Sequence, residues 1–533
     1  MQRLFLLTAA FLLSAVASFA ADAPPERLDS AGIPGTLFLC GGGRLPDEVR
    51  DAFLEAGGGE KCRLVIIPTA TPGEESDALQ EGAEIAELWR VRSPASIEIL
   101  HTRDRAVAND PKFSEPLKTA TAVWFAGGRQ SQIAGAYSGT VVEQELRNLL
   151  DRGGVIGGTS AGAACMSRVM IVRGKIHETP GLGLLPGAIV DQHFLARERR
   201  DRLMEAVAAH PALVGVGIDE GTALIVRGRE LKCLGDSSVH LCLGVCGTHP
   251  PLERVLKSGD VSDLTMFRRG ALARTLPPFP PTEIAAPVVP TGALVIVGGG
   301  GMSKEVVERF IELAGGVDAP IVVLPTANPE PDVNEGRFFE RAGAKNVKSL
   351  AARGKTEVET PESLELLRQA KGVWFGGGRQ WRFVDAYENT QAVELFHDVL
   401  KRGGVIGGSS AGATIQGDYL VRGSPLGNTD MMALGYERGF AFLPGTAIDQ
   451  HFSQRKRFGD MTRVVERHPQ LLGIGLDEAT AIIVRGSVAE VMGAHRVHFF
   501  DRAKPAIDER DYESVSPGGK YELRKREVID AGR

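Results

Sequence analysis

Short apolar runs alternate with amphipathic, charged stretches along most of the chain, and the order of these runs in the first half returns in the second. Each half opens with an apolar run that ends in glycines, at 37–43 and at 294–301. Because the apolar runs are continuous rather than alternating, they predict parallel strands buried on both faces, with the amphipathic stretches as covering helices. The pattern therefore predicts an α/β fold that occurs twice. The later runs of this kind form matched pairs, at 64–67 and 321–324, 122–125 and 372–375, and 155–156 and 405–406.

The duplication sets the expected domain boundaries. The decapeptide GVIGGTSAGA at 154–163 returns as GVIGGSSAGA at 404–413, and a chain of 533 residues exceeds what one hydrophobic core usually organises. Residues 275–291, TLPPFPPTEIAAPVVPT, are rich in proline and poor in helix or strand signals, which is typical of a stiff linker. We therefore expect a first domain at 34–274 and a second domain at 292–533.

An export signal is expected at residues 1–20. Met1 to Arg3 carry one positive charge, the residues up to Phe19 are almost all apolar or small, and Ala20 completes a small-x-small cleavage pattern. The apolar run is shorter than the roughly 20 residues that a membrane-spanning helix needs. The pattern therefore favours export to the periplasm or the medium over a membrane anchor.

Composition and charge narrow the class of ligand. The chain is 43% hydrophobic and 24% charged, which is ordinary for a globular protein, and its formal net charge is -6. It has no long basic block, so nucleic acid and anionic membranes are not expected partners. Neither a metal-binding spacing such as HExxH nor a nucleotide-binding fingerprint occurs, and no metal or cofactor is predicted. A small molecule or a peptide is the expected substrate.

All six cysteines lie in the first half, where an exported protein invites a disulfide interpretation. Alignment of the halves places plain apolar residues opposite most of them, for example Ile415 opposite Cys165. Most are therefore expected to be buried thiols, and Cys242 and Cys246 remain the one plausible pair.

Each decapeptide places a serine, Ser160 or Ser410, inside Gly-x-Ser-x-Gly directly after a predicted strand. A serine on a tight turn between a strand and a helix is held exposed, and small neighbours let a substrate approach closely. A glycine-rich turn that binds an anion would explain one such motif, but two copies in matching contexts favour a nucleophile. We predict one site per half, with these serines as nucleophiles.

A serine hydroxyl becomes a good nucleophile only when a base removes its proton and a carboxylate orients that base. An identical Asp-Gln-His-Phe tetrapeptide follows each serine and supplies His193 and His451 as the candidate bases. Further along, paired acidic residues at 219–220 and 477–478 supply the carboxylate. The spacing leaves open whether the aspartate or the glutamate of each pair acts.

Acyl transfer also needs backbone N–H donors aimed at the former carbonyl oxygen, where negative charge develops. One source is the amide that follows each serine, in Ala161 and Ala411. The other is a glycine of Gly-Gly-Arg-Gln, a motif that ends a predicted strand in each half. Glycine suits this role because the backbone must approach the substrate, and we expect Gly128 and Gly378.

These motifs resemble cyanophycinases, a family of serine-type exopeptidases related to aspartyl dipeptidases and, through the fold, to class I glutamine amidotransferases. The resemblance rests on the GGxQ strand end, the GTSAGA turn, the DQHFxxRxRxxRL segment at 191–203 and the DExTA carboxylate. It implies two tandem class I glutamine amidotransferase-like, flavodoxin-like domains, each a mostly parallel sheet with helices on both faces. It also implies hydrolysis of cyanophycin, a poly-aspartate backbone carrying arginine on each β-carboxyl, to β-aspartyl-arginine dipeptides through an acyl-enzyme.

The resemblance favours glutamate as the orienting carboxylate and implies a set of substrate contacts, in which arginines would bind backbone carboxylates bidentately. The implied triads are Ser160, His193 and Glu220 in the first half and Ser410, His451 and Glu478 in the second. The implied contacts of the first half are Gln130, Asp191, Gln192, Arg197, Arg199 and Arg202. Those of the second half are Gln380, Arg382, Asp449, Gln450, Arg455 and Arg457. The halves differ in that Asp460 stands opposite Arg202, and Arg382 stands opposite Gln132.

Two other functions remain open. A peptidase of another specificity, such as an aspartyl dipeptidase, would keep the triad and change only the basic cleft, whereas a noncatalytic binder of acidic polymers would have lost the chemistry. Glutamine amidotransfer is disfavoured because serine stands where that chemistry uses cysteine. The family usually has one catalytic unit per chain and pairs as a dimer, so the tandem is expected to form an intrachain pseudo-dimer.

Overall fold

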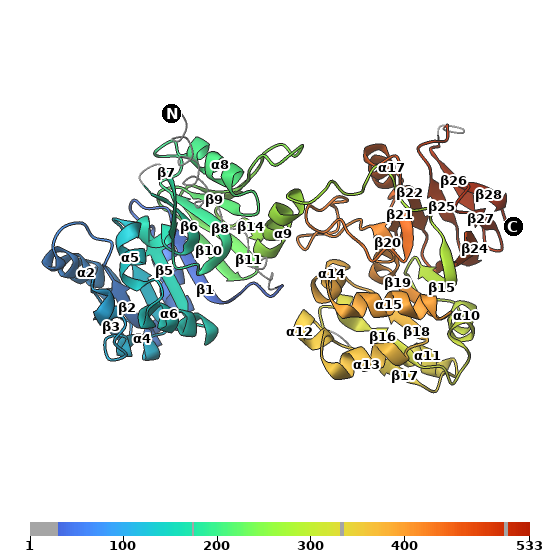
Figure 1. The fold of residues 1–533 in the computed structure, drawn as a ribbon, viewed down its shortest axis with the longest axis horizontal. Helices are drawn as coiled ribbons and strands as arrows, with labels where there is room; N and C mark the ends of the chain where they lie inside the picture. Colours follow the sequence, from blue (N-terminus) through green and yellow to red (C-terminus); the bar gives the residue numbers. More distant parts are fainter. Residues whose placement is uncertain (1–29, 173–174, 331–334, 506–509, 533) are drawn as a thin grey trace, which may run out of the picture.

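The computed structural model describes residues 30–172, 175–330, 335–505 and 510–532. The chain forms two lobes, and helix α9 (Leu264–Arg274) lies between them (Figure 1). The predicted signal peptide, residues 1–20, lies outside the described residues. None of the helices in the described ranges has both the length and the apolar character that crossing a membrane requires.

The main sheet of the first half contains five parallel strands, in the order β3, β2, β4, β5 and β1, and the antiparallel strands β10, β11 and β14 extend it beyond β1. One face packs against helices α1 and α2, and the other packs against α5 and α6. The strands are β1 Ile33–Cys40, β2 Arg63–Ile67, β3 Ser96–Ile99, β4 Ala122–Phe125, β5 Val155–Thr159, β10 Thr222–Gly228, β11 Glu230–Gly235 and β14 Val261–Asp263. The helices are α1 Asp47–Ala56, α2 Glu75–Arg90, α3 Arg105–Ala108, α4 Glu115–Thr119, α5 Gln130–Tyr137, α6 Val141–Asp151 and α7 Ala161–Ala164.

The main sheet of the second half repeats this order with the parallel strands β17, β16, β18, β19 and β15, followed by the antiparallel strands β23, β24, β27 and β28. Helices α10 and α11 cover one face, and α13, α14 and α15 cover the other. The strands are β15 Val289–Val297, β16 Ile321–Leu324, β17 Val347–Ser349, β18 Gly372–Phe375, β19 Val405–Ser409, β23 Thr480–Gly486, β24 Val488–Gly493, β27 Lys520–Glu522 and β28 Glu527–Asp530. The helices are α10 Lys304–Ala314, α11 Arg337–Arg341, α12 Lys355–Val358, α13 Pro361–Gln369, α14 Trp381–Tyr387, α15 Gln391–Lys401 and α16 Ala411–Thr414.

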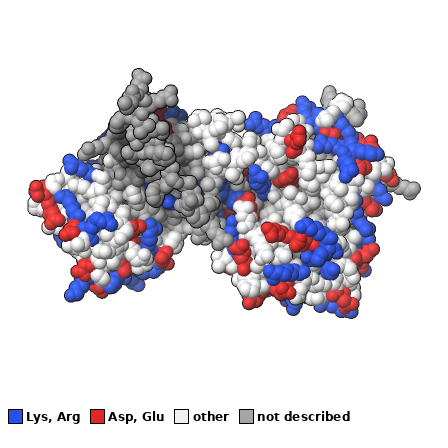
Figure 2. All heavy atoms as spheres, in the orientation of Figure 1, with Lys and Arg blue, Asp and Glu red and all other residues white. Residues whose placement is uncertain are grey.

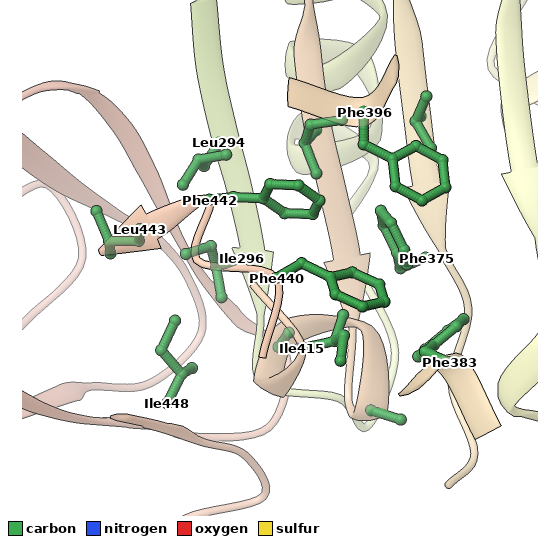
Figure 3. Packing of buried hydrophobic residues seen from close by; sticks show 14 of the residues in the cluster. Leu294, Ile296, Phe375, Phe383, Phe396, Ile415, Phe440, Phe442, Leu443 and Ile448 are labelled. Carbon is green, nitrogen blue, oxygen red and sulfur yellow. The ribbon is translucent and has the colours of Figure 1, made fainter. Parts of the chain in front are cut away.

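Aromatic side chains fill the core on the α14–α15 side of the second half (Figure 3). Phe375 comes from strand β18, Phe383 and Phe396 come from helices, and Phe440 and Phe442 come from the loop before β21. Phe375 and Phe396 have ring centroids 5.1 Å apart at an interplanar angle of 74°, an edge-to-face arrangement that aromatic pairs prefer. This packing fixes the loop before β21 against the main sheet.

Each half also contains a smaller sheet that the sequence did not predict. Its centre is parallel, through β6, β8 and β9 in the first half and through β20, β21 and β22 in the second. Helices α8 (Arg200–Ala209) and α17 (Phe458–Arg467) pack on these sheets. The predicted α/β class with mostly parallel strands is confirmed, and the additional strands are β6 Ser167–Val172, β7 Lys175–Pro180, β8 Leu185–Gln192, β9 Val214–Ile218, β12 Ser238–Leu243, β13 Leu252–Lys257, β20 Gly417–Tyr419, β21 Leu443–Asp449, β22 Leu472–Leu476, β25 Val497–Phe500 and β26 Tyr512–Val515.

The proline-rich linker is shorter than predicted, because strand β15 begins at Val289 rather than after 291. Val289 pairs with Gly486, and the register then shifts before Leu294 pairs with Val484. A strand interrupted by such an irregularity, with Pro290 inside it, carries little periodic signal. The remainder of the segment lies on the second half, where the Phe279 ring stacks 6.0 Å from that of Tyr419.

A buried ion-pair network joins the halves. The Arg229 guanidinium donates to Asp263 of the first half at 2.5 Å and to Asp385 of the second half at 2.6 Å. On helix α9, Arg269 donates to Glu388 at 2.6 Å. Burial raises the pKa of Asp385, which is 4% exposed, while Arg229 and Arg269 act in the opposite direction. The halves are therefore held together by charges that water reaches poorly.

This contact is not repeated in reverse, as a two-fold interface would require. Ser487 stands opposite Arg229 in the aligned halves, and Gly135 stands opposite Asp385. The ion pair between Arg229 and Asp385 thus has no symmetric copy, and the intrachain pseudo-dimer stays a prediction. On the face drawn in Figure 2, positive and negative side chains are interspersed over the described parts of both lobes.

All six cysteines are free, so the structure does not contain the pair considered between Cys242 and Cys246. Cys246 is partly exposed, and the other five cysteines are buried. Burial raises the pKa of Cys242 to about 12, which keeps this thiol protonated.

Candidate active site

Both serines lie on a strained turn between a strand and a helix. Ser160 follows β5 with φ 52° and ψ −112°, and Ser410 follows β19 with φ 56° and ψ −112°. A positive φ is uncommon for a residue with a side chain, and such strain is typical of functional sites. The turn depends on its glycines, because a Cβ on Gly158 would lie 2.6 Å from the Gly162 backbone. The small residues in the motif are therefore a steric requirement of the turn.

In the first half, the serine, histidine and glutamate form one hydrogen-bonded chain. Ser160 Oγ lies 2.8 Å from His193 Nε2, and His193 Nδ1 lies 2.6 Å from Glu220 Oε1. His193 stands directly after β8, and Glu220 lies in the turn between β9 and β10. Gly42 leaves room for the imidazole, since a Cβ there would lie 2.3 Å from His193 Cε1. The glycines that end strand β1 thus pack against the candidate base.

The second half repeats the arrangement. Ser410 Oγ lies 3.0 Å from His451 Nε2, and His451 Nδ1 lies 2.6 Å from Glu478 Oε1. A carboxylate only accepts hydrogen bonds, so the nitrogen facing Glu478 carries the proton and Nε2 is left to accept from the serine hydroxyl. This is the tautomer that a general base needs.

The aspartate next to each glutamate has a different set of partners. Asp219 accepts hydrogen bonds from the amides of Leu195 and Ala196, both at 3.0 Å, and from the Ser237 hydroxyl at 2.8 Å. Asp477 accepts from the Ser453 amide at 2.9 Å. The sequence did not decide which carboxylate of each pair orients the histidine. In the structure the glutamate bonds to the imidazole, and the aspartate bonds to the backbone of the loop that follows the histidine.

The surroundings of both histidines favour the neutral imidazole. Burial lowers the pKa of His193, Glu220 raises it, and the nearby Arg197 and Arg199 lower it, with a net decrease from 6.5. The pKa of His451 is lowered in the same way, with Glu478, Arg455 and Arg457 as its charged neighbours. A neutral imidazole at neutral pH is able to accept a proton from serine.

The glycine turn that ends β4 lies against the nucleophile. Gly128 has φ +131°, and a Cβ there would lie 2.1 Å from the Ala70 oxygen. A Cβ on the preceding Gly127 would lie 3.7 Å from Ser160 Cβ. Ala161 is the first residue of helix α7, so its N–H has no partner within the helix. The expected oxyanion donors are therefore next to the serine, as are Gly378, with φ +135°, and Ala411 in the second half.

Asp191 is fully buried and holds two arginines of the first half. Arg202 donates to both of its carboxylate oxygens, through Nε at 2.6 Å and through Nη2, and Arg199 Nη1 lies 3.5 Å from it. Arg199 also donates to the Gln192 carbonyl at 2.7 Å. The substrate contact that the resemblance implies for Asp191 stays a prediction, and in the structure its oxygens face Arg199 and Arg202.

The second half neutralises the equivalent aspartate from another direction. Asp449 is fully buried and accepts from Arg457 at 2.8 Å and from Arg422 Nε at 3.1 Å to each oxygen. Arg422 also donates to Asp460 at 2.6 Å, so a loop arginine balances the aspartate that stands opposite Arg202. Arg422 was not among the site residues predicted from the sequence. The tripeptide Val-Arg-Gly, which follows both serine turns at 172–174 and 421–423, is the signal that points to it.

The remaining predicted contacts divide into buried and exposed groups. Gln130 donates to the Ile171 carbonyl at 2.8 Å, and Gln380 donates to the Val421 carbonyl at 2.9 Å, so both amides tie the glycine turn to the chain that follows the serine. Gln380, Gln192 and Gln450 are buried, and Gln130 is partly buried. Arg382 donates to the Ala327 carbonyl at 2.9 Å and lies over the Trp381 ring. Arg197 and Arg455 are exposed next to the histidines, where a ligand can reach them.

Comparison with known proteins identifies the family of this site. The sequence model of peptidase family S51 matches the chain twice, at 37–234 and 294–492. The chain belongs to peptidase family S51. It is therefore a serine-type peptidase, built from two S51 units in tandem.

Curated relatives of this S51 protein match about two fifths of its length. It is 33% identical over 204 residues to a cyanophycinase of Geminocystis herdmanii, covering 37% of this chain and 75% of that protein. It is 34% identical over 225 residues to a cyanophycinase of Synechococcus elongatus, covering 39% and 68%. Among solved structures, a peptidase from an acI-B1 Actinobacterium aligns at 26% identity with a TM-score of 0.38, covering 44% of this chain and 98% of that one.

No group of three or more His, Cys, Asp or Glu side chains in the described parts of the chain is arranged to hold a metal ion. That a metal or cofactor is not required stays a prediction from the sequence.

Proposed function

We propose that this protein is an exported peptidase that hydrolyses cyanophycin to β-aspartyl-arginine dipeptides at two Ser-His-Glu sites. The observation that carries the proposal is the hydrogen-bonded chain from serine through histidine to glutamate, found at the same place in both halves. The S51 match and relatives that bear the name cyanophycinase support the substrate class. The apolar N-terminal pattern at residues 1–20 supports export.

In the proposed reaction, His193 Nε2 removes the Ser160 proton as Oγ attacks the scissile carbonyl carbon. The amides of Ala161 and Gly128 donate hydrogen bonds to the former carbonyl oxygen, where the negative charge develops. The imidazolium, held by Glu220, then donates its proton to the leaving nitrogen and an acyl-enzyme forms. Water, deprotonated by the same imidazole, attacks the ester and restores the serine.

The same steps apply to Ser410, His451 and Glu478. In this scheme Asp191 and Asp449 hold arginines next to the base, while the exposed Arg197 and Arg455 provide positive charge for carboxylates of the substrate backbone. The engaged arginines, Arg199, Arg202 and Arg457, would act by fixing the shape and charge of the pocket.

The test uses the full chain with purified cyanophycin. Ser160→Ala and Ser410→Ala each remove one nucleophile, and the double variant is expected to lose turnover while still binding the polymer. Chromatography with mass spectrometry identifies the product, which is expected to be the β-aspartyl-arginine dipeptide. Unchanged turnover in the double variant would remove both serines from the mechanism.

Two outcomes would favour the other functions. Exclusive cleavage of α-aspartyl dipeptides, with cyanophycin left intact, would indicate an aspartyl dipeptidase-like enzyme. Binding of cyanophycin by the unmodified protein, with no product from any aspartyl peptide, would indicate a noncatalytic binder.

A further inference from the structure

A carboxylate contacts the glycine turn of the second site, and no equivalent contact is found in the described residues of the first site. Glu335, just before helix α11, accepts a hydrogen bond from the Gly377 amide at 3.3 Å. Gly377 belongs to the Gly-Gly-Arg-Gln turn, next to the expected oxyanion donor Gly378. Within the described residues of the first half, no side chain is bonded in this way to the equivalent Gly127.

A single sequence difference between the halves explains where the carboxylate lies. A Cβ on Gly376 would lie 2.1 Å from Glu335 Oε1, a distance that real Cβ atoms do not show. The first half has Ala126 at this position, whose methyl group takes up that space. Gly376 therefore admits the carboxylate in the second half, and the alanine excludes one in the first.

The occupied amide lies close to the nucleophile. A Cβ on Gly377 would lie 3.8 Å from Ser410 Cβ. The amides on either side of the turn bond to the preceding loop, Gly376 to the Leu324 carbonyl at 3.0 Å and Arg379 to the Ala327 carbonyl at 2.8 Å. The amides of Gly377 and Gly378 are thus the ones in the turn that a substrate oxygen can reach. The Gly377 amide is already hydrogen-bonded to Glu335.

We propose that Glu335 inhibits the second site from within the chain and makes it a different catalyst from the first. A carboxylate on the Gly377 amide, next to the expected donor Gly378, places negative charge close to where the transition state also develops it. Ser410 then reacts only when the Glu335 side chain, which is partly exposed, moves off the turn. The inference rests on the serine chemistry of the proposed function, but not on the identity of its substrate.

Labelling with a fluorophosphonate tests this without the natural substrate. The serine oxygen displaces fluoride from phosphorus, the hydroxyl proton passes to the imidazole, and the phosphonyl oxygen takes the position of the oxyanion. Peptide mass spectrometry measures the labelling rates of Ser160 and Ser410 in the same full-length chain, so the first site serves as the internal reference.

Glu335→Ala is expected to increase the Ser410 labelling rate by about tenfold or more, since it removes a like charge from beside the developing oxyanion. Glu335→Gln, which removes the charge, is expected to give a smaller increase. Gly376→Ala is expected to give an increase as well, because its methyl group excludes the carboxylate. Ser160 labelling should stay constant in all three. Glu330→Ala, on the same loop, is the matched control and should change neither rate.

Equal Ser410 labelling in the unmodified protein, Glu335→Ala and Glu335→Gln would overturn the inference while Ser160 labelling leaves the proposed function standing. No label on either serine in any variant would overturn the serine chemistry and the inference together. Labelling that responds as expected in a protein that leaves cyanophycin intact would support the inference and reject only the substrate.

Discussion

Replacement of Arg422 is the most direct test of how the second half stabilises its buried aspartate. Arg422 is 3% exposed and contacts Asp449, which is fully buried, as well as Asp460. In Arg422→Val, Asp449 keeps Arg457 at 2.8 Å and the Gln450 amide at 3.0 Å but loses its second guanidinium. The Asp460 carboxylate, whose side chain is 28% exposed, can be solvated by water in place of the Arg422 guanidinium. The cost therefore comes mainly from Asp449.

The magnitude follows from what remains around Asp449. Breaking a buried ion pair costs about 3–5 kcal/mol when the remaining charge has no other partner. Because Arg457 still neutralises Asp449, we expect a loss of about 2–3 kcal/mol in the free energy of unfolding of the second half. For a domain of this size, that loss lowers the midpoint of thermal unfolding by roughly 5–10 °C.

A second substitution separates charge balance from general damage. Asp460→Arg added to Arg422→Val places an arginine where the first half has Arg202, which donates to Asp191, and is expected to recover more than half of the loss. Arg463→Ala is the matched control, because Arg463 pairs with Asp460 on the exposed face of α17 and is expected to cost less than about 1 kcal/mol.

The assay is differential scanning calorimetry, with hydrogen exchange of the β21 peptides to assign the transition to the second half. A midpoint that Arg422→Val leaves within about 1 °C of the unmodified protein would refute the reasoning, since a shift of several degrees is expected. A double variant no more stable than the single one would refute the proposed exchange of partners.

Four further outcomes are expected. The kcat/KM profile should fall on the acid side with an apparent pKa below 6.5 and stay level from pH 7 to 8, because both histidines must be neutral and their pKa values are lowered by burial; an acid limb centred above 7 would contradict this. In a Ser160→Ala background, Glu478→Gln should lower kcat by about 10³–10⁴ with little change in KM, since the amide no longer fixes the tautomer; an unchanged kcat would exclude Glu478 from the mechanism. Arg229→Met should cost about 3 kcal/mol, because it leaves Asp385 buried without its closest cation, and it should speed proteolysis within 275–291; cleavage at the unmodified rate would argue against the interface. Iodoacetamide should modify only Cys246 in the folded protein, and recovery of a Cys242–Cys246 disulfide would contradict the structure.

The sequence predicted the elements whose signal is local. The second strand of the second half, predicted at 321–324, is β16 at Ile321–Leu324, and the strand predicted at 122–125 is β4 at Ala122–Phe125. Short, continuous apolar runs bounded by Gly, Pro and polar residues carry this information within a few residues. The positions of the serine turns could be predicted for the same reason.

The smaller sheets could not be predicted in the same way. Strand β9, Val214–Ile218, pairs with β8 on one side and with β12 on the other. Its sequence VGVGI contains two glycines, which weaken the strand signal, and a Cβ on Gly217 would lie 2.5 Å from the Phe194 ring. Those glycines are explained by the ring packed against them, which is a long-range contact that no local pattern contains.

The partners of the charged residues were the least predictable part of the site. The sequence contained Asp191, Asp449 and all of the arginines, but not the direction from which each aspartate would be neutralised. A hydrogen-bonded chain such as Ser160, His193 and Glu220 tolerates little variation in the placement of its atoms, because each bond needs both a short distance and an aligned donor.

The partner of a buried carboxylate can vary more in position, since a guanidinium that approaches from any side with adequate geometry can neutralise its charge. The serine–histidine and histidine–glutamate distances are accordingly close in the two halves, 2.8 and 2.6 Å in the first and 3.0 and 2.6 Å in the second, whereas the charges around them differ. Asp460 stands where the first half has Arg202 and pairs with Arg422, and Gly376 stands where the first half has Ala126 and leaves space for Glu335. In the Glu335 proposal, this freedom in placing charge gives two copies of one hydrogen-bonded chain different reactivity within a single protein.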